Sequence, residues 1–159
     1  MKQKTRYFLA ALRINLGWIF LWSFVDKLFG LGFSTAPENA WLAGGSPTYG
    51  FLTHATAGPL AGLYQSMAGA FLVDALFMFG LAGLGVALTL GIGLKIAGIG
   101  GSLMMLMMWS AHLPPVQNPL IDQHIVYALV IILLAQTEAG MTWGLGQWWR
   151  EHVGIPVLE

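Results

Sequence analysis

Residues 68–111 read AGAFLVDALFMFGLAGLGVALTLGIGLKIAGIGGSLMMLMMWSA, an almost continuously apolar stretch in which Asp74 and Lys95 are the only charged side chains. As one helix, at 1.5 Å per residue, it would be about twice as long as the ~30 Å hydrocarbon core of a bilayer is thick. The chain must therefore turn back on itself within this stretch. The glycines just before Lys95 mark the natural turn, which predicts transmembrane helices over about 68–90 and 95–111.

Two further apolar segments flank this helical hairpin. The first, about 7–28, follows basic residues as a secretory signal would, but Arg13 and Asn15 interrupt the short apolar region that a signal needs, and the residues after it match a cleavage site poorly. It is better interpreted as a retained helix. The other segment, about 121–138, follows a Pro-rich turn. The sequence therefore predicts an all-α fold, an integral membrane four-helix bundle that forms a single domain over 1–159.

The connection between the first two predicted spans, about 30–67, is rich in Gly, Pro, Ser and Thr, and residues 44–48 form its clearest turn cluster. A connection of this length inside a compact domain usually carries function or structure of its own. Residues 48–66 keep apolar side chains beside polar ones, which is typical of an interfacial or re-entrant helical piece, and Pro59 indicates that the piece is broken. We expect a long, partly structured first external loop.

The composition identifies lipid as the natural solvent. Of the 159 residues, 57% are hydrophobic and 9% are charged, whereas a soluble domain carries about a quarter charged residues. The formal net charge is zero, so the chain lacks the excess positive charge typical of nucleic-acid-binding proteins, and no nucleic-acid partner is expected. The chain contains no cysteine, so it cannot itself form Fe–S clusters, Cys-ligated metal sites or Cys-x-x-Cys oxidase centres.

The basic residues outside the predicted spans gather on one side of a four-span topology: Lys2, Lys4, Arg6, Lys95 and Arg150. Only Lys27 borders the other side. By the positive-inside rule, both termini and the turn between the second and third spans lie in the cytoplasm. The long first loop and the Pro-rich turn then face outward, and the chain is expected to be a multi-pass protein of the plasma membrane.

Ionisable side chains within a membrane are costly and are therefore candidates for function. In this topology most of them fall in the outer half of the bundle: Asp26, Lys27, Asp74, His112, Asp122 and His124, with Trp109 within a turn. One interpretation is a structural ion-pair network in which Lys27 pairs with Asp74 or Asp122. The other is a polar pocket for a quinone headgroup or small redox molecule, in which Lys27 and His124 donate to a carbonyl oxygen and a carboxylate relays protons.

Other uses of these polar residues are less well matched. Haem ligation by His112 and His124 is disfavoured because His112 adjoins a Pro-Pro turn. No metal site is expected from Asp122 and His124, since residues two positions apart on a helix do not share a face. On the inner side, Arg13 is expected to reach the headgroups or to pair with Glu138, in preference to lining a transport pathway.

The order of these motifs resembles the DoxX/DoxD-like family of small four-helix membrane proteins. The matching stretches are Arg13 with Gly17 and Phe20, residues 26–33 (DKLFGLGF), 44–48 (GGSPT) with 50–52 (GFL), Asp74 with 76–78 (LFM), the Gly-rich turn before Lys95, Asn118-Pro119 with Asp122 and His124, and 143–146 (WGLG) with Trp148. Proteins of the DoxD type are membrane subunits of thiosulfate:quinone oxidoreductase, and those of the DoxX type are linked to membrane oxidoreductase and thiol-stress systems. The resemblance implies site residues at Arg13, Lys27, Asp74, Asn118, Asp122 and His124.

The function expected from the sequence is that of a membrane oxidoreductase, or a subunit of one, that passes electrons from a small donor such as thiosulfate to quinone. The expected catalytic residues are Lys27, Asp74, Asp122 and His124, and the expected cofactor-binding residues are Arg13, Asp26, Trp109, His112 and Asn118. Other redox proteins or a second copy of the chain are expected partners. Two alternatives stay open, a non-enzymatic anchor or assembly protein and a small-solute transporter.

Overall fold

The computed structural model describes residues 2–115 and 118–153, and within these ranges the chain is all-helical and contains no strand. The fold is carried by four longer helices, α1 Gln3–Phe29, α3 Phe71–Leu90, α4 Leu94–Ala111 and α5 Gln123–Gln136, and by two short ones, α2 Ala61–Ser66 and α6 Gly146–Val153. The predicted all-helical class is confirmed.

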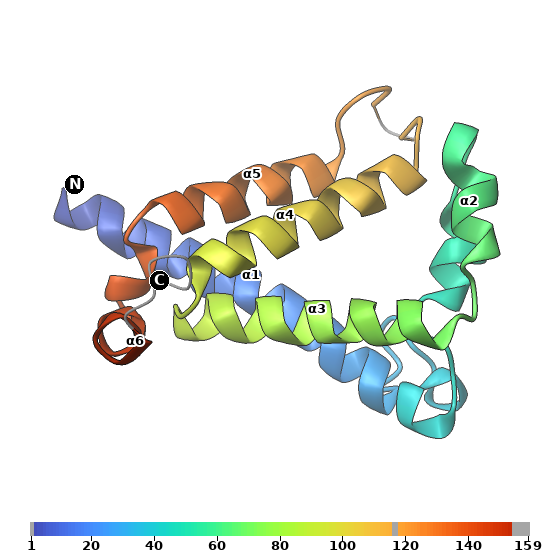
Figure 1. Ribbon diagram of the computed structural model, residues 1–159, viewed down its shortest axis with the longest axis horizontal. Helices are drawn as coiled ribbons and strands as arrows, with labels where there is room; N and C mark the ends of the chain where they lie inside the picture. Colours follow the sequence, from blue (N-terminus) through green and yellow to red (C-terminus); the bar gives the residue numbers. More distant parts are fainter. Residues whose placement is uncertain (1, 116–117, 154–159) are drawn as a thin grey trace.

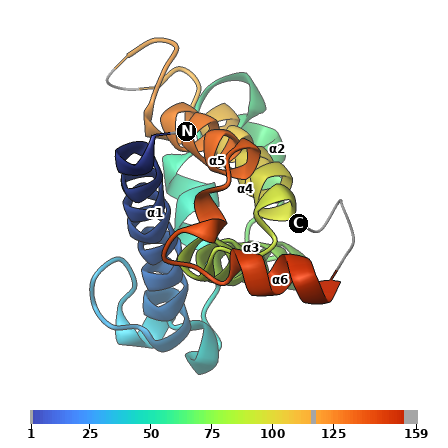
Figure 2. The same cartoon turned by 90° about the vertical axis from the view of Figure 1, so that its left-hand side faces the viewer.

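The longer helices form two closely packed pairs, α1 with α3 and α4 with α5 (Figure 1). The two pairs diverge toward the end where α2 lies, while at the opposite end α6 crosses the bundle, as the end-on view in Figure 2 shows. Buried side chains from all four longer helices, such as Phe20, Leu84, Met105 and Ile131, make up one core. The bundle is therefore tight at one end and open at the other.

Small residues let the helices of this core approach closely. A Cβ at Gly85 would lie 2.7 Å from the backbone nitrogen of Leu21, and a Cβ at Gly101 would lie 2.7 Å from Leu84. Between α3 and α4, Gly91 (φ 74°) and Gly93 (φ 57°) adopt the left-handed conformation, which L-residues with a side chain rarely adopt. The predicted reversal of the apolar stretch at these glycines is confirmed.

Three helices, α1, α3 and α4, are long and apolar enough to cross a membrane. Their outward faces carry large apolar side chains, such as Phe71 (75% exposed) and Ile99 (69% exposed). Exposed apolar surface on this scale is stable against lipid rather than water, which indicates a membrane protein.

Helix α5 is shorter than the fourth span expected from the sequence. It has 14 residues, which extend about 21 Å at 1.5 Å per residue. Asp122 is an extended N-cap residue before it, and Thr137 returns to extended backbone after it. The predicted range of about 121–138 therefore extends two residues beyond the helix at each end, because Asp122 caps its start and the backbone becomes extended at Thr137.

The long connection between α1 and α3 carries structure of its own, as expected. It contains the short helices η1 Pro37–Asn39, η2 Trp41–Ala43, η3 Phe51–Ala55 and η4 Gly58–Leu60, followed directly by α2. The break expected at Pro59 lies instead at Thr56 and Ala57, whose backbone is extended. Pro59 is near the start of η4, a position that suits proline because the first helical N–H groups lack intrahelical acceptors.

Candidate functional site

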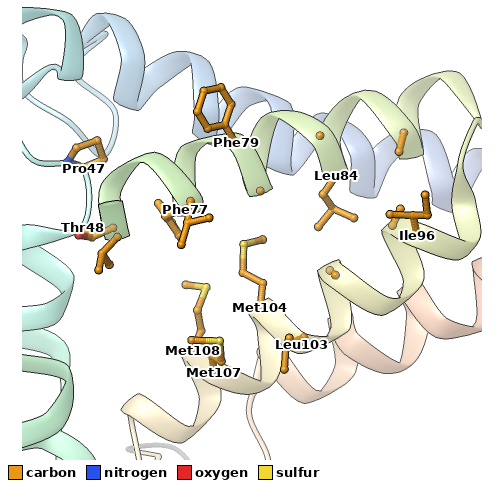
Figure 3. A pocket seen from close by; sticks show the side chains of 18 of the residues that line it. Pro47, Thr48, Phe77, Phe79, Leu84, Ile96, Leu103, Met104, Met107 and Met108 are labelled. Carbon is orange, nitrogen blue, oxygen red and sulfur yellow. The ribbon is translucent and has the colours of Figure 1, made fainter. Parts of the chain in front are cut away.

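A groove of about 850 Å³ runs between α3 and α4, and Figure 3 shows its side chains from close by. Polar side chains occur only toward its ends, with Trp149 of α6 at one end and Lys27, Thr48 and Tyr64 at the other. The walls between these ends are apolar, and they include Phe77 and Leu84 of α3 and Ile96, Met104, Met107 and Met108 of α4. The groove has the shape and chemistry of a site for an amphiphilic molecule.

Lys27 is the one charged residue among those lining the groove. It lies half-buried in the last turn of α1, and within the described ranges it makes no hydrogen bond or ion pair. The neighbouring Asp26 is occupied elsewhere, since its carboxylate accepts hydrogen bonds from Phe33 N (3.2 Å), Ser34 N (2.9 Å) and Ser34 Oγ (2.7 Å). The Lys27 ammonium is therefore an available donor, whereas Asp26 fixes the start of the connection between α1 and α3.

Asp74 holds a different part of that connection. Its Oδ1 atom accepts hydrogen bonds from Ser46 Oγ (3.0 Å), Thr48 N (3.0 Å) and Thr48 Oγ1 (2.6 Å). The turn cluster that the sequence marked at 44–48 is thereby fixed to the first turn of α3, and Pro47 and Thr48 are placed on the rim of the groove. The expected ion pair between Lys27 and Asp74 is not formed.

Three titratable groups meet where α4 ends and α5 begins. The Oδ2 atom of Asp122 lies 2.7 Å from His124 Nδ1, and the His124 ring stacks on that of His112, with 5.6 Å between centroids and 22° between planes. His112 in turn packs against Phe51, which lines the groove, and its Nδ1 atom lies 3.0 Å from the carbonyl oxygen of Met108. We call Asp122, His124 and His112 the histidine stack.

The geometry of the histidine stack differs from one expectation. Asp122 and His124 do interact although they are two residues apart, because Asp122 precedes the helix and its extended backbone lets the carboxylate turn back as the N-cap. The near-parallel rings of His112 and His124 face each other and leave no space for a macrocycle between them. No cluster of three or more His, Cys, Asp or Glu side chains able to hold a metal occurs within residues 2–115 and 118–153.

The pKa of Asp122 is perturbed, and this residue lies outside the membrane-crossing helices. Burial by itself raises the pKa of its carboxyl group. The hydrogen bond and positive charge of His124, together with the backbone N–H groups of His124 and Ile125, outweigh burial and lower the pKa below its usual value of 3.8. Asp122 is therefore the ionised partner of the stack near neutral pH.

Trp109 and Asn118, both expected to bind a cofactor, shape the loop before α5. Trp109 Nε1 donates to the carbonyl oxygen of Leu120 (2.9 Å), and Asn118 Oδ1 accepts from the backbone nitrogens of Leu120 (3.0 Å) and Ile121 (3.2 Å). Asn118 forms a local turn of a kind common for this residue. Neither residue lines the groove.

Arg13 lies at the other end of the bundle, fully buried, and all five of its N–H groups donate to backbone carbonyls. The acceptors are those of Ala139, Leu88, Thr89, Thr142 and Trp143. We call this set the carbonyl cage. The expected pairing of Arg13 with Glu138 is wrong, since Glu138 instead faces the exposed Arg6 at 3.5 Å and Arg150 at 3.8 Å.

The carbonyl cage leaves Arg13 no N–H group with which to bind a cofactor. Its charge is stabilised by the negative end of the α3 dipole, because two of the acceptors belong to the last turn of that helix. Glycines allow the backbone to come this close: a Cβ at Gly91 or at Gly144 would lie 2.9 Å from an Arg13 nitrogen. The Gly-rich segment after α5 is the sequence signal that could have revealed the cage.

The single outer cluster expected from the sequence is thus divided into separate parts. Lys27 lines the groove, Asp26 and Asp74 bind the connection between α1 and α3, and Asp122 joins the histidine stack. Sequence reasoning missed the groove residues Thr48, Tyr64, Met104, Met107 and Met108. The three methionines had a detectable signal, because positions three and four apart share one face of a helix.

These features define a helical membrane protein with an apolar groove between two helix pairs and an amine at one end of it. Comparison with known proteins finds no matching family model, no similar curated protein and no similar solved structure. The resemblance to the DoxX/DoxD-like family stays a prediction from the sequence motifs.

Proposed function

We propose that the chain is a multi-pass plasma-membrane protein that binds a quinone and serves as an oxidoreductase or as the membrane subunit of one. The observation that carries this proposal is the half-buried Lys27 ammonium, which has no acceptor within the described residues and opens onto an apolar groove. A quinone headgroup supplies carbonyl oxygens as acceptors, and a charge-assisted hydrogen bond to one of them would satisfy the amine. Thr48 and Tyr64 complete the polar end of the groove.

The histidine stack supports the redox half of the proposal. Quinone reduction to quinol takes up two electrons and two protons, and imidazole side chains can deliver protons as general acids. The stack reaches the groove through Phe51, which touches the His112 ring. With thiosulfate as the donor, two thiosulfate ions lose two electrons and form one sulfur–sulfur bond. Since the chain has no cysteine, the sulfur chemistry would occur on this external donor, directly or through a partner protein.

Quinone binding to the purified protein, followed by quenching of its tryptophan fluorescence, tests the proposal directly. Lys27→Met removes the ammonium at similar side-chain length, and loss of one hydrogen bond to a charged donor should weaken binding about tenfold or more. Lys4→Met, on the exposed start of α1, is the matched control and should bind as the wild type does. Equal affinities of the two variants for quinone, or no binding by the wild type, would refute the proposed site. Thiosulfate-dependent quinone reduction is the accompanying activity assay.

The four-span topology with cytoplasmic termini is part of the same proposal. It is supported by the basic residues near the start of α1 and by the position of that start and of α6 at the same end of the molecule (Figure 1). Because the chain has no cysteine, a single introduced cysteine is the only thiol in this protein that a maleimide reagent can label. An impermeant maleimide should label Asn118→Cys but reach Lys4→Cys and Glu151→Cys only after permeabilisation. Labelling of Glu151→Cys from outside would mean that α5 does not cross the membrane.

A second candidate function, anchoring or assembly of partner redox proteins, is favoured by exposed apolar side chains on the connection between α1 and α3. Phe33 is 75% exposed and Leu42 is 68% exposed there. This candidate predicts that a protein co-purifies with the chain, that Phe33→Ser releases it, and that quinone does not bind. Quinone binding that depends on Lys27 would decide against it.

A further inference from the structure

The groove between α3 and α4 extends well beyond the polar end at which the proposed quinone headgroup would bind. We propose that the apolar length of this groove binds the isoprenoid tail of a long-chain quinone. The substrates are then membrane-borne quinones with extended tails, and short water-soluble quinones bind weakly. This inference rests on the proposed function and adds to it a tail site and a substrate class.

The polarity of the groove sets the orientation of its occupant. Lys27, Thr48 and Tyr64 gather at the end where the helix pairs diverge, and Trp149 lies at the other end. Between them α3 and α4 present only apolar side chains and glycines to the groove. An occupant must therefore have one polar end and a continuous apolar chain, with the polar end toward Lys27.

The length of the groove suits an extended apolar chain. Its α3 wall runs from Val73 to Ala87, about 21 Å at 1.5 Å per residue. A single hydrocarbon chain is thin enough to lie within the groove.

The walls suit an irregular, branched chain. Met104, Met107 and Met108 all line the groove (Figure 3), and methionine side chains are flexible and polarisable enough to adapt to such a shape. Gly83 and Gly100 line the same groove from α3 and α4, and a Cβ built at either of them would meet no atom within 4 Å. The space above these glycines is open for a tail.

These open glycines provide the test. Gly83→Leu and Gly100→Leu each add a side chain on a wall of the groove. A Cβ at either position meets no atom within 4 Å, and leucine has a higher helix propensity than glycine, so both variants should fold. Gly62→Leu on α2 is the matched control, because a Cβ there also meets nothing within 4 Å and the residue does not line the groove. Binding of a multi-prenyl ubiquinone and of its tailless headgroup analogue is measured for each protein in lipid nanodiscs.

The expected result is selective for the long-tailed ligand. The two groove-filling variants should bind multi-prenyl ubiquinone about tenfold or more weakly, since each methylene lost from an apolar site costs about fourfold in affinity. Their affinity for the tailless analogue should be unchanged, whereas Lys27→Met should lose affinity for both. A long-tailed quinone with a photoreactive group at the tail end should crosslink to α3 and α4 near Trp149.

Three outcomes would overturn the tail site. The groove-filling variants could bind long-tailed quinone as Gly62→Leu does, they could release a bound phospholipid without any change in quinone binding, or they could convert a dimer to a monomer. In each case a persisting effect of Lys27→Met would leave the proposed headgroup site intact. Loss of that effect as well would remove the proposed function itself.

Discussion

Replacement of Arg13 by methionine tests the carbonyl cage most directly. The substitution keeps an unbranched side chain in the same space but removes all five donors at once. The carbonyl groups of Leu88 and Thr89 lie in the last turn of α3, where intrahelical donors run out, and those of Ala139, Thr142 and Trp143 lie after α5. The bonds to Leu88 and Ala139 are buried and those to Thr89, Thr142 and Trp143 are partly buried, so at least the first two carbonyls would be left without a donor.

The expected loss of stability is large. A buried acceptor left without a partner costs about 1–3 kcal/mol, and the costs of the unpaired carbonyls add together. Relaxation of the surrounding backbone and the removal of a buried charge offset part of this total. Removing one partner from a buried charged group typically costs about 3–5 kcal/mol, and we expect Arg13→Met to fall in that range. Arg13→Lys keeps the charge but offers at most three donors, so at least two carbonyls stay unpaired, and the loss should be about 2–3 kcal/mol.

Unfolding by sodium dodecyl sulfate in mixed micelles, followed by tryptophan fluorescence, measures these losses. Arg6→Met is the matched control on the same helix. Arg6 meets Glu138 at 3.5 Å with both side chains about half exposed, and such a pair contributes at most about 1 kcal/mol. If Arg13→Met were no less stable than Arg6→Met, the cage would not hold the ends of α1, α3 and the segment after α5 together, and the reasoning would fail.

Three further predictions concern the other parts of the molecule. Asp74→Ala should speed amide hydrogen exchange in the turn around Thr48, since it removes the acceptor of three hydrogen bonds, and unchanged exchange there would contradict the proposed anchoring. Gly85→Ala should destabilise the protein by about 1–3 kcal/mol because its Cβ would press on the backbone of α1, whereas Gly83→Ala, in open space, should be neutral or stabilising in the same unfolding assay. Asp122 has a lowered pKa in the folded state, so the stability it contributes is complete above the unfolded pKa of about 3.9 and is lost as the pH falls through the folded value. The melting temperature of the wild type should therefore decrease more steeply below about pH 4 than that of Asp122→Asn, and parallel curves would argue against this role.

The sequence predicted several features of this protein that the structure confirms. The helical class, three of the four expected membrane-crossing helices, the reversal at Gly91 and Gly93 and the structured connection between α1 and α3 all followed from it. Each depends on a local property: hydropathy summed over a helix length, a left-handed residue at a turn, or the mixture of apolar and polar side chains along a connection. Such properties depend on residues that are close together in the sequence, so they can be predicted without the tertiary structure.

The partners of the buried polar groups were decided only by the tertiary structure. Arg13 meets carbonyls from residues far along the chain, and Asp74 meets Ser46 and Thr48 rather than Lys27. A buried charge binds whichever donors or acceptors the packing brings to it, and backbone groups compete with the charged side chains that residue type suggests. The groove has the same origin, because it arises from the divergence of two helix pairs rather than from any one of them. Composition and periodicity therefore determined that this chain belongs in a lipid bilayer, and helix packing alone decided that Lys27 lies half-buried at one end of an apolar groove.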